Sequence, residues 1–126
     1  MKLLIIAATL LTSLGANAAD LACSIHPKQG IADADLPALA KVTQAKAEST
    51  ALKAVNVSSA SVASGELEAE GGCLIYSFDI QIPGRKSIVE VAVDAGTGKV
   101  LAQKHESPNE QASEKAIDAA AAKTRN

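Results

Sequence analysis

The sequence predicts an α+β fold: one main α-helix packed on an antiparallel β-sheet of three to four strands, followed by an alanine-rich C-terminal helix or tail. Alternating apolar and polar residues over 73–82 and 88–94, with shorter runs at 66–68 and 99–101, predict the strands, and glycine turns separate them. Residues 36–55 have helical spacing instead. Because an antiparallel sheet commonly has one apolar and one solvated face, we expect the helix to cover the apolar face.

The first residues are typical of a signal peptide spanning 1–18. Lys2 precedes an apolar run, and small residues up to Ala18 fit a cleavage site. The run is shorter than the roughly 20 residues of a membrane span, and a retained anchor is the alternative. A lipoprotein modified at Cys23 is a second alternative, which Asp20 disfavours because an apolar residue is wanted three positions before the cysteine. We therefore expect a periplasmic or secreted protein without stable membrane insertion after cleavage.

Composition limits the mature chain to one small domain. About 108 residues follow Ala18, and their formal charge is about −3 once the leader and its lysine are removed. There is no basic patch, and Tyr76 and Phe78 are the only aromatic residues. Binding of nucleic acid needs clustered cations and is therefore not expected. The core must be built from small aliphatic side chains, and such small domains commonly need an additional covalent or metal link.

Cys23 and Cys73 are candidates for a disulfide bond that would provide that link. Both follow the predicted cleavage site, and an oxidising compartment favours pairing. The bridge would close a loop of about 50 residues. Two separate thiols, with Cys73 buried near the start of its strand, are the alternative. A redox-active pair is disfavoured because the sequence has no Cys-x-x-Cys spacing.

The remaining segments are assigned along the chain. Residues 19–35 show no steady period and suggest a loosely ordered lead-in that Cys23 could pin to the sheet. The helix expected over 36–55 could break at Thr43, a good N-cap, and Asn56 is a plausible stop. A weak, polar first strand is expected over residues 59–68, before the glycine pair at 71–72.

The turn after the third strand contains Asp94, Gly96, Thr97 and Gly98. An aspartate can accept hydrogen bonds from backbone N–H groups of a turn, and glycines tolerate positive φ. Residues 96–99 resemble a phosphate-binding loop only weakly, because the full glycine spacing and the following Ser or Thr are missing. We therefore interpret this turn as structural.

The C-terminal segment, residues 107–126, is predicted to be a helix or a disordered tail. Ser107, Pro108 and Glu110 form a good helix start, with cap, first-turn proline and capping-box acid. Alanine then dominates and Ile117 is the only large apolar residue, so the helix has little to bury. A solvated tail is favoured over a helix that binds a partner.

No pattern of catalytic residues is present in the sequence, so we predict that the protein is not an enzyme. His26 and His105 are the only histidines. With Cys23 and Cys73 they could form a metal site on paper, but the sequence interpretation finds no pair at ligand spacing and predicts no metal or cofactor. A cysteine–histidine nucleophile is not expected either, because nothing in the sequence places a base beside a thiol.

Together these segments resemble the PepSY domain family over residues 36–106. The motifs that carry the resemblance are Thr43-Gln44-Ala45-Lys46-Ala47-Glu48, Gly65-Glu66-Leu67-Glu68, Leu74-Ile75-Tyr76-Ser77-Phe78-Asp79-Ile80, Val91-Ala92-Val93-Asp94 and Thr97-Gly98-Lys99-Val100. Two features depart from the family pattern: Asn56-Val57 stands where proline and glycine are frequent, and the cysteine pair is additional. The resemblance implies a helix on an antiparallel sheet, found in exported bacterial proteins and in propeptides of thermolysin-type metallopeptidases.

Two functions follow from this resemblance. The first is a non-catalytic regulator or inhibitor of a protease in the periplasm or outside the cell, which docks on its partner through an exposed strand edge carrying Glu66 and Glu68. The alternative is a passive binding or sensing module for a small ligand or an envelope protein. A pocket lined by Tyr76 and Phe78 would favour the alternative, and burial of both rings against the helix would not.

Overall fold

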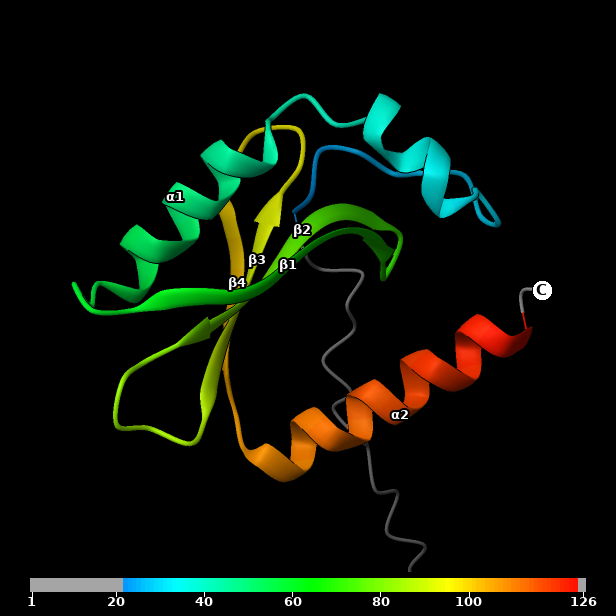
Figure 1. The fold of residues 1–126 in the computed structure, drawn as a ribbon. Coiled ribbons are helices and arrows are strands. Elements are labelled where there is room, and N and C mark those ends of the chain that lie inside the picture. The colour runs from blue at the N-terminus through cyan, green and yellow to red at the C-terminus, as the bar shows by residue number, and fades with distance from the viewer. Residues whose placement is uncertain (1–21, 125–126) are drawn as a thin grey trace, which may run out of the picture.

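A computed structural model describes residues 22–124, so the leader expected at 1–18 lies outside the described part of the chain. The elements are η2 (Asp33–Ala38), α1 (Gln44–Val55), β1 (Ser61–Glu70), β2 (Cys73–Gln81), β3 (Ile88–Asp94), β4 (Val100–Glu106) and α2 (Pro108–Thr124). The strands form one antiparallel four-stranded sheet in the order β1-β2-β3-β4. The predicted α+β fold, with a main helix on an antiparallel sheet and a second helix at the C-terminal end, is confirmed (Figure 1).

The two helices lie on opposite sides of the sheet (Figure 1). α1 covers one face through Ala47 and Ala51, whose small side chains are fully buried and allow the helix to approach the strands closely. Strand alternation supplies the other half of this core, as the sequence predicts. Its fully buried strand residues are Leu74, Phe78, Ile80, Val89, Val91 and Val93.

The helix expected over residues 36–55 is in fact two elements, with the break at Thr43 that the sequence allows. The side chain of Thr43 caps α1 by accepting a hydrogen bond from the N–H of Lys46, at 3.3 Å. Before the break, the N–H groups of Lys41 and Val42 both donate to the carbonyl of Ala95, so this stretch is held against the sheet instead of continuing the helix. α1 ends at Asn56, whose left-handed backbone (φ 56°) is the predicted stop.

The lead-in expected over 19–35 is described from residue 22 onward, and Cys23 attaches it to the sheet as the sequence analysis anticipates. Residues 22–43, here called the strap, run beside the sheet and enter its core: Leu36, within η2, is only 1% exposed. The carbonyl of Ile25 accepts a hydrogen bond from the N–H of Leu74 at 2.9 Å. These contacts join residues far apart in sequence, which is why the strap shows no local period.

Gly65 allows β1 to lie directly over an aromatic ring. A Cβ atom at this position would come within 2.7 and 2.8 Å of two ring carbons of Phe78, which is itself fully buried. We expect Gly65→Ala to lower the free energy of unfolding by about 1–3 kcal/mol, the usual range for overpacking a core. Chemical denaturation measures this change. Ala63→Val, at an exposed position of the same strand, is the control and should change stability by less than about 0.5 kcal/mol.

α2 begins where the sequence places a helix start. The N–H and hydroxyl of Ser107 donate to Glu110 Oε2 at 2.8 and 2.9 Å, and the N–H of Glu110 donates back to Ser107 Oγ at 3.4 Å. The backbone hydrogen bond from Ser107 lowers the pKa of Glu110. Among the described side chains of α2 only Gln111 is partly buried, and Ile117 is 66% exposed. Within residues 22–124, no helix has both the length and the apolarity needed to cross a membrane.

Candidate functional site

β1 is an edge strand ten residues long. In the part of the chain that the structure describes, its only strand partner is β2, and its other edge carries no paired strand. The register places Glu66 opposite Ser77 and Glu68 opposite Ile75. Both glutamates therefore project from the sheet face that α1 does not cover, beside the edge that a partner strand could extend.

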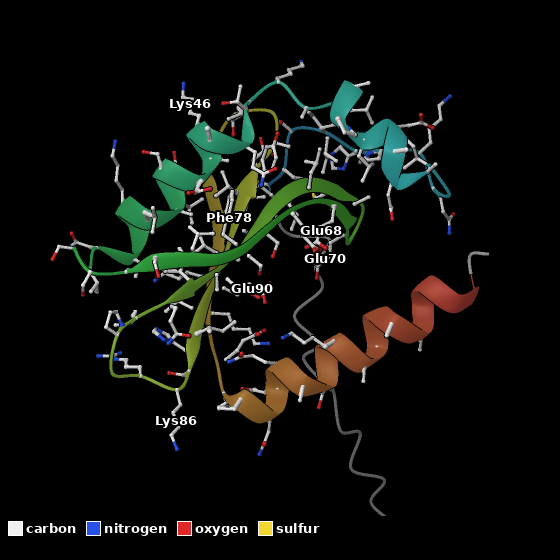
Figure 2. All side chains as sticks on the ribbon, in the orientation of Figure 1. Lys46, Glu68, Glu70, Phe78, Lys86 and Glu90 are labelled. Carbon is white, nitrogen blue, oxygen red and sulfur yellow. A yellow bond between two sulfur atoms is a disulfide. The ribbon has the colours of Figure 1, made fainter. Side chains whose placement is uncertain are left out.

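That second face of the sheet is strongly acidic. In Figure 2, Glu68, Glu70 and Glu90 lie on the side of the sheet away from α1 and toward α2. Between this face and α2 lies a groove of about 520 Å³, to which α2 contributes Gln111, Lys115 and Ile117. The carboxylates that line the groove are Glu66, Glu68, Glu70, Asp79, Glu90 and Glu106. The groove is therefore negatively charged and continuous with the β1 edge.

Two of the groove acids are fixed by hydrogen bonds. Glu106 is only 1% exposed and forms an ion pair with Lys104, Nζ to Oε1, at 3.1 Å. Asp79 accepts a hydrogen bond from the hydroxyl of Ser64 at 2.9 Å, across the β1–β2 pair. These contacts hold part of the acidic lining in one arrangement.

Asp94 anchors the strap to the turn between β3 and β4. Its side-chain oxygens accept hydrogen bonds from the N–H and hydroxyl of Ser24 at 2.9 and 2.6 Å, and from the N–H and hydroxyl of Thr97 at 2.7 and 2.8 Å. The residue is 1% exposed. Burial raises the pKa of Asp94, but the hydrogen bonds from Ser24 and Thr97 outweigh it and lower this pKa from an ordinary 3.8 to about 2.

The two glycines of this turn serve different purposes. Gly98 has positive φ, 77°, as the sequence suggests for a turn glycine. Gly96 does not; a Cβ there would instead overlap the hydroxyl of Ser24 and approach the side chain of Ile25 at 3.1 Å. Gly96 therefore provides space for the strap. This role depends on a contact between distant segments, so the turn sequence alone does not reveal it.

Cys23 and Cys73 form a disulfide bond, with Cα atoms 5.8 Å apart, and this confirms the predicted pairing. His26 lies beside the bridge: its Nδ1 is 3.7 Å and its Nε2 4.0 Å from Cys23 Sγ. Nδ1–H donates to the carbonyl of Gly72 at 3.0 Å. From the sequence these residues were a possible set only on paper and were set aside for lack of ligand spacing, although Cys23-x-x-His26 is such a spacing.

Both aromatic rings are buried in the core. Phe78 is fully buried and Tyr76 is 5% exposed, with ring centroids 6.2 Å apart. The hydroxyl of Tyr76 donates to the carbonyl of Val42 at 2.7 Å, which fastens the strap to β2. Burial of both rings does not favour the alternative function, a binding module with a ligand pocket lined by Tyr76 and Phe78.

The fold and its site define a helix-on-sheet module held by a strap, with the edge strand β1 paired to another strand on one side only. Residues 41–104, half of the chain, match the PepSY family, described as peptidase propeptide and YPEB domain. The chain belongs to this family. No curated protein gives a significant match, and no solved structure does so either.

Proposed function

We propose that this protein is an exported, non-catalytic regulator of a protease, and that it acts by docking its β1 edge on the enzyme. The observation that carries the proposal is the long edge strand of a domain whose family includes peptidase propeptides. An extended segment of a partner can add a strand to such an edge, with main-chain hydrogen bonds giving affinity and flanking side chains giving specificity.

The charge of the neighbouring face indicates what kind of partner fits. Glu66 is exposed and Glu68 half-buried, and both lie where side chains of an added strand would pass. A partner with cationic side chains beside its docking strand would be attracted to this face and guided into register. The acidic groove thus supports a role in selecting the partner, beyond the backbone contacts that any edge strand offers.

Export and absence of catalysis are supported separately. A disulfide bond is typical of an oxidising compartment, and the predicted leader directs the chain there. Cys23 has a histidine beside it, yet its sulfur is bonded to Cys73 and therefore is not a nucleophile in this state. A regulator needs only a rigid surface, and this scaffold supplies one.

Residual protease activity tests the proposal. The purified protein is incubated with proteases of its compartment, including a thermolysin-type metallopeptidase, and stoichiometric loss of activity without cleavage of the protein is expected. No loss of activity across the panel would contradict the proposed function.

The docking surface is tested by charge reversal. We expect Glu66→Lys to weaken inhibition at least about tenfold, because it opposes the cationic partner surface. The matched control is Glu48→Lys, the same charge change on α1, on the other side of the sheet, and it should leave inhibition within about twofold. Inhibition that persists unchanged in Glu66→Lys would reject this edge while leaving the regulatory function in place.

A further inference from the structure

We propose that Cys23, Cys73 and His26 form a binding site for a thiophilic metal ion, of the Zn²⁺ type, when the disulfide bond is reduced. One donor atom from each residue lies within 4.8 Å of those of the other two. The residues come from two segments, the beginning of the strap and the start of β2, that the fold already holds together. The proposed site is thus a second state of the same residues that form the bridge.

The distances suit a metal ion with thiolate and imidazole ligands. Zinc binds sulfur at about 2.3 Å and nitrogen at about 2.0 Å, so in a tetrahedral site a sulfur and a nitrogen ligand lie about 3.5 Å apart. Nδ1 and Nε2 of His26 are 3.7 and 4.0 Å from Cys23 Sγ. The ring is therefore close enough to share an ion with this sulfur once it turns so that a nitrogen lone pair points toward the ion.

The hydrogen bond of His26 decides which nitrogen coordinates the ion. Nδ1–H donates to the carbonyl of Gly72 at 3.0 Å, so the neutral ring carries its lone pair on Nε2. Histidine ligands of metal ions are commonly oriented by such a bond from the other ring nitrogen to a backbone carbonyl. Gly71 and Gly72 both have positive φ, 55° and 79°, in the two-residue turn before Cys73, and this turn presents the carbonyl to the ring.

The site requires a balanced reduction step. A dithiol reductant transfers two electrons and two protons to the Cys23–Cys73 bond and itself becomes a disulfide, which leaves two thiols in the protein. Binding of Zn²⁺ then displaces a proton from each thiol, because the thiolate is the ligand. Three protein ligands leave the fourth coordination position for water, on the exposed side where His26 lies.

Zinc binding by the reduced protein tests this proposal. The full mature protein is reduced with a phosphine, which is then removed without air, and titrated with Zn²⁺ against a chromophoric chelator. We expect one ion bound per reduced chain, and none at the same concentrations by the oxidised protein. Co²⁺ in place of Zn²⁺ should give the absorption of thiolate-to-metal charge transfer, which reports the sulfur ligands directly.

Variants of the two histidines supply the control. His26→Ala should weaken the binding of Zn²⁺ at least about tenfold, while His105→Ala, at an exposed position of β4, should not change it. Failure of the reduced protein to bind Zn²⁺, or equal affinity in His26→Ala and the unaltered protein, would overturn the proposal.

A thermal melt of the reduced protein, with and without Zn²⁺, covers the case in which reduction unfolds the domain. Zinc is expected to raise the melting temperature of the reduced protein, because the ion replaces the lost link between strap and β2. A reduced protein whose melting temperature is unaffected by Zn²⁺ would contradict the proposal as well.

Discussion

Asp94→Ala is expected to destabilise the protein by about 3 kcal/mol. The substitution removes the buried acceptor of four hydrogen bonds, so the N–H and hydroxyl groups of Ser24 and Thr97 lose their charged partner. Denaturation by urea, followed by circular dichroism, measures the loss. Asp35→Ala, at an exposed position of η2, serves as the control and should change stability by less than about 0.5 kcal/mol. A loss below about 1 kcal/mol for Asp94→Ala would contradict the role assigned to this side chain.

The same carboxylate should make stability depend on pH. Its folded pKa, about 2, lies below the ordinary 3.8, so the folded state favours the ionised form. This contribution is therefore fully present above about pH 4 and is lost as the pH falls through the folded pKa, amounting to about 2 kcal/mol. The free energy of unfolding of Asp94→Asn should therefore fall by about 2 kcal/mol less between pH 4 and pH 2 than that of the unaltered protein. An identical acid profile in the two proteins would contradict the prediction.

Removal of the disulfide bond is expected to have the largest effect on stability. The bridge joins residues separated by 50 positions, and chain entropy gives about 4 kcal/mol for closing such a loop in the unfolded state. We expect Cys23→Ala/Cys73→Ala to melt roughly 15 °C lower in a calorimeter, given the usual entropy of unfolding for a domain of this size. Reduction of the unaltered protein should produce a similar shift in the absence of metal ions. A shift below about 3 °C would show that the bridge contributes little.

These two anchors should not act independently. Cys23 and Ser24 are neighbours in the chain, so the bridge and the hydrogen bonds of Asp94 fix the same part of the strap. Once one anchor is lost, the other must order a longer mobile segment by itself. We therefore expect the loss of unfolding free energy in a variant altered at both Asp94 and Cys23 to differ from the sum of the losses in the two single variants. Such non-additivity is usual for groups that share a structural unit.

Local patterns in the sequence predicted the elements that depend on local physics. Alternation identified β2 and β3, because a strand with one buried face repeats every two residues. The cap at Thr43 and the capping box of Ser107 and Glu110 also hold, since each involves atoms three residues apart. The contacts of the strap other than its disulfide could not be predicted, because its partners lie about 50–70 residues away, of which Asp94 is the clearest case.

The candidate site could be predicted only in part for the same reason. Glu66 and Glu68 stand out by their alternation in a polar strand, but the groove arises when they meet acids of β2, β3 and β4 on one face. Gly96 must lack a side chain because Ser24 packs against it, and these two residues are too far apart in sequence for a local pattern to connect them. The cluster around His26 was named from the sequence and rejected, although the spacing of His26 from Cys23 is visible there.

The bridge between strap and β2 determines what a single proteolytic cut would do to the chain. The exposed link between α1 and β1, residues 56–59, lies inside the loop that the disulfide closes. A single cut anywhere between Cys23 and Cys73 therefore leaves two fragments that are still one covalent molecule. The N-terminal fragment would stay tethered to the strand against which it packs. A chain nicked in this loop therefore comes apart only after its disulfide bond is also reduced.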